Sequence, residues 1–175
     1  MSTIDLILLG SLYQSPKSPY ELQKQIEDRN LSRWVKIGKN TVYKNVVIYE
    51  KKGYVTSEIV RNGKMPEKTV YSLTNIGKEY FLELMTEISK IQTRVFLEFN
   101  AVIVNLALLE RNDALNCLCN IKNSITNTKS QISEQLPTHS NIPLCGKTIL
   151  EQQYMILETL EKWEQNFEQQ FVKEY

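Results

Sequence analysis

The chain has 175 residues, of which 42% are hydrophobic and 23% are charged, and this composition is that of a globular protein rather than a disordered one. Its formal net charge of +1 hides an asymmetry. Residues 1–78 hold 13 Lys and Arg against 7 Asp and Glu, a net charge of +6, whereas residues 79–175 hold 8 against 13, a net charge of −5. This pattern predicts an anion-binding module joined to a module with another task.

Several other classes of protein are disfavoured by the sequence. Residues 1–12 lack the basic start and the small-residue cleavage site of a signal peptide. The most apolar run, Val95–Leu109, is short for a membrane span and predicts a buried helix instead. The three cysteines, Cys117, Cys119 and Cys145, have no metal-like spacing. We therefore expect reduced thiols, no cofactor and no metal, in a cytoplasmic protein that does not contact a membrane.

Two helices are predicted before residue 31. Apolar side chains at four-residue spacing in Ile4–Tyr13 indicate a core helix. After a break, the sequence Ser-Pro-Tyr-Glu at 18–21 supplies an N-cap serine, a proline at the first helical position and the glutamate of a capping box. Asn30 is expected to end this second helix, and a connector over Leu31–Ile37 leads to a third.

The third helix, which Asn40 or Thr41 can cap and Gly53 ends, carries the functional interpretation. One side of it is an apolar stripe formed by Val42, Val46 and Tyr49. Amides, hydroxyls and cations lie away from this stripe, as a recognition helix in a major groove requires. The alternative is an ordinary amphipathic surface helix. The polar set is Lys39, Thr41, Lys44 and Asn45.

A β-hairpin is predicted directly after this helix. Tyr54–Val60 and Thr69–Leu73 are rich in β-branched and aromatic residues, and a turn-rich segment at 61–68 joins them. Its cations can lie on phosphates as a wing does, although a charged hairpin tip can also be merely solvated. Its place after the third helix favours the wing. The cations are Arg61, Lys64 and Lys68.

The second half of the chain is predicted to be helical. Thr74 caps a helix whose apolar residues continue from Ile76 to Ile91, and further helices are expected over Val95–Leu109 and from a cap at Asn112 to about Gln135. A loop over 136–143 precedes the last helix, which begins near Cys145. That helix has a long apolar stripe, with Glu158, Glu161, Glu164 and Glu168 expected outside it.

Such a stripe can be covered by packing within the chain or by a second copy of it. The candidate dimer-interface residues are Phe96, Phe99, Ile103, Ile149, Ile156, Leu160, Trp163 and Phe167.

Four segments, in this order and spacing, resemble the PadR-type winged-helix transcription regulators. The second helix start at 18–22 resembles the family's Gly-Tyr-Glu-Leu, and Asn-Thr-Val-Tyr at 40–43 stands where Gly-Thr-Leu-Tyr is usual. The segment 63–74, closed by Gly77, resembles Gly-Arg-Pro-x-Lys-x-Tyr-x-Leu-Thr. Phe99–Leu106 resembles part of the dimerisation region of the longer members.

The resemblance implies a mainly α fold with a β-hairpin wing: a winged helix-turn-helix DNA-binding domain at 1–78 and a helical dimerisation domain at 79–175. It implies a sequence-specific transcriptional regulator, expected to be a repressor, that acts as a homodimer on a pseudo-palindromic operator. Two recognition helices would enter successive major-groove faces roughly 34–36 Å apart. The expected DNA contacts are Tyr20, Lys36, Lys39, Asn40, Thr41, Tyr43, Lys44, Asn45, Arg61, Lys64 and Lys68; Tyr43 could equally be half-buried.

Three departures from the family pattern affect the operator and the affinity rather than the fold. Asn40 replaces a glycine, Val47 and Ile48 stand where cations are common, and Glu67 stands where arginine is usual. The apolar pair on the third helix motivates an alternative, a protein-interaction module of the same fold that lacks specific DNA binding.

Some relatives respond to phenolic acids or drugs, so a small aromatic effector is a further possible partner. Four aromatic residues could line a pocket between the two domains, or pack in the core or at the dimer interface. They are Tyr13, Trp34, Tyr154 and Trp163. We expect no enzyme activity, because His139 is the only histidine and no catalytic motif surrounds it.

Overall fold

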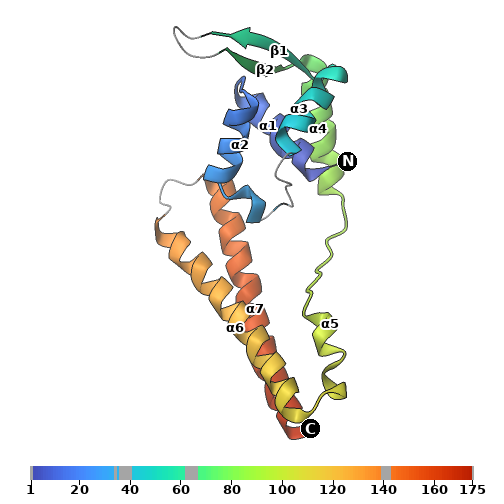
Figure 1. Ribbon diagram of the computed structural model, residues 1–175, viewed down its shortest axis with the longest axis vertical. Coiled ribbons are helices and arrows are strands. Elements are labelled where there is room, and N and C mark those ends of the chain that lie inside the picture. Colours follow the sequence, from blue (N-terminus) through green and yellow to red (C-terminus); the bar gives the residue numbers. More distant parts are fainter. Residues whose placement is uncertain (1, 34, 36–40, 62–66, 139–142, 175) are drawn as a thin grey trace. The chain divides into compact units, whose positions relative to one another are not determined.

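The structure, a computed structural model, describes residues 2–33, 35, 41–61, 67–138 and 143–174. The chain divides into two compact units, Met1–Thr93 and Arg94–Tyr175. Both are helical, and the first also carries one antiparallel hairpin, so the predicted fold class is confirmed (Figure 1). The functional division at residue 78 stays a prediction.

The first unit starts as its sequence predicts. Ser18 Oγ accepts a hydrogen bond from the Glu21 amide at 3.3 Å, and Glu21 Oε2 accepts one from the Ser18 amide at 2.7 Å, which completes the capping box. Asn30, at φ +50°, follows the end of this helix. The elements are α1 (Thr3–Gln14), α2 (Pro19–Asp28), the short 3-10 helix η1 (Leu31–Arg33), α3 (Thr41–Lys51), β1 (Val55–Val60), β2 (Lys68–Leu73) and α4 (Asn75–Ser89).

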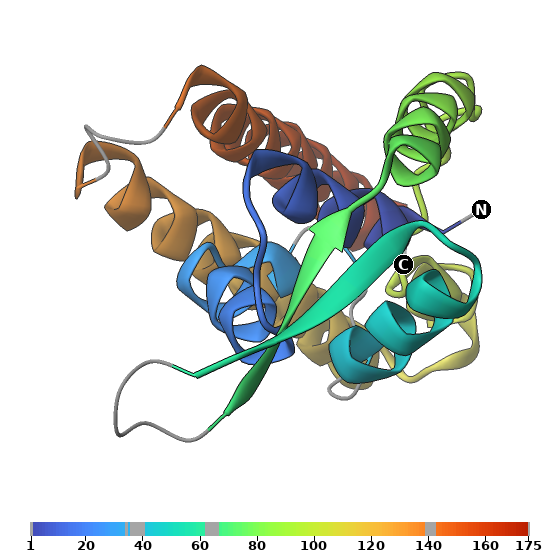
Figure 2. The ribbon, with the colours of Figure 1, turned by 90° about the horizontal axis from the view of Figure 1, so that it is seen from above.

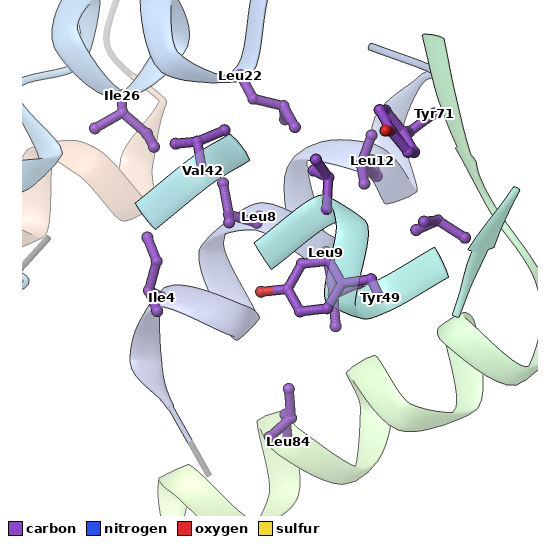
Figure 3. Packing of buried hydrophobic residues seen from close by; sticks show 12 residues of the cluster. Ile4, Leu8, Leu9, Leu12, Leu22, Ile26, Val42, Tyr49, Tyr71 and Leu84 are labelled. Atoms are coloured by element: carbon purple, nitrogen blue, oxygen red, sulfur yellow. The ribbon is translucent and has the colours of Figure 1, made fainter. Parts of the chain in front are cut away.

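The core of the first unit is built around α1. Leu8 and Leu9 of α1 are completely buried, and they face the apolar stripe of α3 together with Leu84 of α4 (Figure 3). Burying one such side chain stabilises the fold by about 1.5–3 kcal/mol. The stripe predicted for the third helix therefore fixes which side of α3 remains outside.

Two glycines shape the junction between α3, the hairpin and α4. Gly53 adopts φ +75° at the end of α3, as predicted. Thr74 Oγ1 caps α4 by accepting from the Gly77 amide at 3.0 Å, and it donates to the Gly53 carbonyl at 2.7 Å. A Cβ on Gly77 would lie 2.0 Å from the carbonyl oxygen of Tyr54, so no side chain fits there.

The hairpin is regular and is paired on a second side. The two strands lie side by side as one antiparallel hairpin (Figure 2). Val55 lies opposite Leu73, and the register continues to Val60 opposite Lys68. Beyond β2, the connection between α1 and α2 forms a bridge. The Lys17 amide donates to the Tyr71 carbonyl at 3.1 Å, and the Tyr71 amide donates to the Lys17 carbonyl at 2.9 Å.

The second unit is dominated by two long helices that run side by side (Figure 1). Lys122 bonds to Glu168 at 3.1 Å, and Lys129 bonds to Glu161 at 2.6 Å. From the first ion pair to the second, the residue number rises in one helix and falls in the other, so the two helices are antiparallel. The elements are α5 (Asn100–Ile103), the 3-10 helix η2 (Leu106–Leu108), α6 (Arg111–Thr138) and α7 (Leu144–Glu174).

The prediction of one buried helix over Val95–Leu109 is wrong. Only two short helical pieces form there, and Phe96, Val104 and Leu108 are between 78% and 80% exposed. In this run only Leu106 is buried. Because most helical stability in proteins comes from packing an apolar face, an apolar run whose side chains are largely uncovered in the chain does not form one long helix.

Several element limits also differ from expectation. Helix α4 ends at Ser89, and Ile76 and Ile91 are exposed rather than part of its inner stripe. Helix α6 begins before the predicted cap at Asn112 and runs two residues past Leu136.

Glu164, expected on the outside of α7, is 1% exposed. It lies four residues after Leu160 and seven before the buried Phe171, which places it within the apolar stripe itself.

Candidate nucleic-acid interface

The outward face of α3 is set by what its inward face buries. With Val42, Val46 and Tyr49 buried at 3% exposure or less, Tyr43, Lys44 and Val47 point to solvent. Tyr43 is 53% exposed, so the alternative of a half-buried Tyr43 is wrong. This face offers a phenol, a cation and one apolar side chain. Thr41 opens the helix and is half-buried.

Asn45 has a partner within the fold. Its side-chain amide donates to Asp5 Oδ1 of α1 at 3.4 Å, and the Tyr49 hydroxyl donates to the same oxygen at 2.6 Å. Burial, followed by the hydrogen bond to Asp5, raises the pKa of the Tyr49 phenol, so it remains a donor at physiological pH. Asn45 is half-buried, and one of its donors already faces α1.

The two described cations at the hairpin both face acids. Lys68 Nζ lies 2.8 Å from Glu21 Oε1 of α2, and Arg61 lies 4.0 Å from Glu67. The hydrogen bond from Lys68, followed by those from Ser18, lowers the pKa of Glu21 to about 2, so this carboxylate stays ionised in the folded protein.

The other predicted DNA contacts divide into two groups. Tyr20, in the first turn of α2, is 67% exposed. The remaining ones lie outside the described residues: Lys36, Lys39, Asn40 and Lys64.

Two residues that shape this face were missed in the sequence. Asp5 is the only charged residue in the apolar segment Ile4–Tyr13, and an acid in such a helix signals a polar partner. The sequence predicts only the capping role of Glu21, but its carboxylate has a second oxygen, which accepts a hydrogen bond from Lys68.

The predicted dimer residues are partly used within the second unit. The Trp163 ring stacks with Phe99, at 5.5 Å between ring centroids, and with Phe167, at 5.7 Å. Ile103 packs against the buried cluster of the second unit, which includes Leu106 and Leu118. Phe96 and Ile156 are instead 79% and 41% exposed. The half-buried ones are Ile149 and Leu160.

The aromatic residues considered for an effector pocket belong to different units. Tyr13 packs against Phe81 in the first unit, at 5.3 Å between ring centroids. Tyr154 lies in the second unit, where Lys129 Nζ is 5.4 Å from its ring centroid, and so does Trp163. Trp34 lies outside the described residues.

Other kinds of site receive no support from the described residues. No group of three or more His, Cys, Asp or Glu among them could hold a metal ion. None of their helices combines the length and apolar character needed to cross a membrane. Cys117 is half-buried, Cys119 and Cys145 are exposed, and all three are free thiols. His139 lies outside the described residues.

The comparison with known families decides the identity of the first unit. Residues 8–83 match the sequence profile of the transcriptional regulator PadR-like family. Residues 8–83 are PadR-like in sequence. The resemblance seen in its motifs is thereby confirmed for this part of the chain. No curated protein sequence matches the chain.

Solved PadR structures share the fold over nearly the whole chain. Bacillus subtilis PadR in complex with operator DNA is 17% identical, with a TM-score of 0.81 over 96% of this chain and 98% of that one. The same protein in complex with p-coumaric acid is 16% identical, with a TM-score of 0.78 over 97% of this chain and 95% of that one. The Vibrio cholerae virulence activator AphA is 14% identical, with a TM-score of 0.69 over 94% of this chain and 95% of that one. These likenesses extend the fold assignment to the helical second unit.

Proposed function

We propose that this chain is a sequence-specific DNA-binding transcriptional regulator that acts as a homodimer on a pseudo-palindromic operator. The observation that carries the proposal is the seating of α3. Three buried side chains hold one side of it on α1, and the opposite side presents Tyr43 and Lys44 to solvent. A short helix fixed in this way, beside a hairpin, is the arrangement with which winged-helix proteins enter a major groove.

The proposed contacts fall into two kinds. Lys44 and Tyr20 are exposed and suited to phosphates, which supply most of the salt-sensitive affinity. Thr41 and Asn45 of α3 would contact base edges, and the Tyr43 hydroxyl would contact a phosphate. Four further residues keep the roles proposed from the sequence: Lys36, Lys39, Asn40 and Lys64.

We propose the second part of the chain, residues 79–175, as the dimerisation domain and residues 1–78 as the DNA-binding domain. The support is the exposed apolar surface around Phe96, which a second copy of the chain would cover. A two-fold dimer places its recognition helices on two half-sites, which is why the operator is proposed to be pseudo-palindromic.

A repressor controlled by a small aromatic effector is the form of regulation we propose. Bacillus subtilis PadR has been seen both with operator DNA and with p-coumaric acid, which supports this form. AphA is described as an activator, so a reporter fused to the regulated promoter must decide the sign.

The decisive experiment is binding of the purified protein to the DNA upstream of its own gene, over a salt series. Wild type should bind tightly, weaken with salt, and lose specific binding in Lys44→Ala/Asn45→Ala. Binding that ignores both the substitution and the DNA sequence would reduce the domain to a generic basic patch. Absence of binding at low salt would favour the protein-interaction module, for which the exposed Val47 on α3 is the supporting observation.

A further inference from the structure

Glu21 joins two elements that are far apart in the sequence. Its Oε2 accepts from the Ser18 amide at 2.7 Å and from the Ser18 hydroxyl at 2.8 Å, which caps α2. Its Oε1 accepts from Lys68 Nζ at 2.8 Å, which ties the first turn of α2 to β2. Because the first oxygen is held by the cap, the second has a fixed position from which to hold the lysine.

Lys68 lies at the end of the paired part of the hairpin. It is opposite Val60 in the last pair of the register before the tip. Three residues further along β2, Tyr71 exchanges two backbone hydrogen bonds with Lys17, in the connection that leads into α2. The strand is thus attached to the start of α2 at two places, once through the backbone and once through the ion pair.

We propose that Glu21 and Lys68 form a clamp that positions the wing, so that Lys68 sets where the hairpin lies on DNA instead of neutralising a phosphate. The inference rests on the proposed DNA-binding function and changes the role first predicted for Lys68. Lys68 is a positioning residue, and Glu21 is its partner.

The two roles predict different salt dependence. Affinity for DNA falls as salt rises, and each cation that neutralises a phosphate makes the plot of log affinity against log salt concentration steeper by about 0.9. A lysine that is already paired with a carboxylate releases no DNA counterion of its own. Glu21 is also informative, because an acid that merely lies near DNA repels it, whereas an acid that holds the wing favours binding.

The experiment measures binding of the full chain to the DNA upstream of its own gene, over a salt series. The variants are Lys68→Met, Glu21→Gln and their combination. Glutamine at position 21 preserves the capping box, because it can still accept from the Ser18 amide. Lys44→Met is the matched control, since Lys44 is an exposed cation on α3 and is expected to contact phosphate.

We expect Lys68→Met and Glu21→Gln each to weaken binding about two- to fivefold, the range of a partly exposed ion pair, without changing the salt slope. The double variant should bind DNA no more weakly than either single variant. Lys68→Arg keeps a cation opposite Glu21 and should bind DNA as tightly as the wild type. Lys44→Met should make the dependence of log affinity on log salt concentration shallower by about one. The proposal would be overturned if Lys68→Met made the salt dependence as shallow as Lys44→Met does, or if Glu21→Gln bound DNA more tightly than the wild type.

A readout without DNA separates this proposal from the proposed function. Amide hydrogen exchange at Lys17 and Tyr71 should accelerate in Lys68→Met and in Glu21→Gln, because the strand loses one of its two attachments. Unchanged exchange would refute the clamp even if all variants bind DNA. Failure of wild type to bind DNA at any salt concentration would refute the proposed function, and with it the role of the clamp on DNA, while the exchange rates still decide whether the clamp exists.

Discussion

Tyr49 of α3 donates its hydroxyl hydrogen to Asp5 of α1 across 2.6 Å, and this bond ties α3 to α1 at a buried position, where Tyr49 is 3% exposed. The Asn45 amide reaches the same carboxylate oxygen from one turn earlier in α3. The rotation of α3 about its own axis is therefore fixed by a polar contact in addition to apolar packing. A substitution at Asp5 or Tyr49 should therefore change both the free energy of unfolding and the proposed contacts of α3 with DNA bases.

Tyr49→Phe removes the buried hydroxyl and leaves the aromatic ring in place. A hydrogen bond to a charged acceptor contributes about 1.5–3 kcal/mol, so the free energy of unfolding should fall by that amount in urea titrations. Tyr43→Phe is the control, because Tyr43 is 53% exposed on the same helix and should change stability by less than about 0.5 kcal/mol. Equal effects of the two substitutions would contradict the assigned contact.

Gly77→Ala tests the close approach at the start of α4. The added Cβ would stand 2.0 Å from the Tyr54 carbonyl oxygen, so the backbone must shift, at a cost of about 1–3 kcal/mol. Gly53 provides the contrast. No atom lies within 4 Å of a Cβ there, but φ is +75°, so Gly53→Ala should be costly and Gly53→Asn much less so. Thermal unfolding of the three variants measures these differences.

Glu164→Met should stabilise the second unit at neutral pH. Both carboxylate oxygens of Glu164 are buried without a hydrogen-bond partner among the described residues. Burial, opposed by Lys122 and assisted by Glu168 and Glu161, raises the pKa of Glu164. The variant should raise the free energy of unfolding at pH 7 by about 1–3 kcal/mol, the cost of an unsatisfied buried group.

The sign of the pH dependence follows from linkage. In the pH range just above the ordinary glutamate pKa, the folded protein holds a proton on Glu164 that the unfolded chain has lost. The contribution of Glu164 to the stability of the wild type therefore falls as pH rises from about 4.5 through the raised pKa of the folded state. The advantage of Glu164→Met should shrink towards pH 4. An advantage that is constant between pH 4 and pH 7 would show that Glu164 has an ordinary pKa.

Phe96→Ser tests the proposed dimer. Phe96 is 79% exposed within one chain, so the substitution should change the unfolding free energy of the monomer by less than about 0.5 kcal/mol. If a second copy covers this ring, analytical ultracentrifugation should show a weaker dimer. Ile59→Ser on the hairpin, 69% exposed, is the control and should leave self-association unchanged. An unaltered dimer in Phe96→Ser would remove this residue from the interface.

The elements that could be predicted from the sequence are those with strong local signals. The capping box at Ser18 and Glu21, the apolar stripe of α3 and the left-handed Gly53 all depend on neighbours within a few residues. The errors came where distant contacts decide. The run around Phe96 is apolar enough for a buried helix, yet nothing in its own sequence says whether a partner covers it.

Side-chain partners were the least predictable part of the candidate site. Lys68 reads as a free cation at a hairpin, and only the folding of β2 against α2 brings it to Glu21, 47 residues earlier in the chain. The same is true of Asn45, whose partner Asp5 is 40 residues away. Composition predicts the sign of charge on a surface, whereas pairing determines how much of that charge remains available to a ligand.

The bridge between Lys17 and Tyr71 has a consequence for how copies of this protein meet in concentrated solution. A two-stranded sheet has two edges, and each can recruit a strand from another molecule. The connection before α2 covers part of the β2 edge, so among the described residues β1 is the more open one. Glu58 stands exposed at the middle of β1, and a charge on an open edge opposes intermolecular sheet formation. Glu58→Val should therefore make the protein more prone to aggregate while leaving its fold intact.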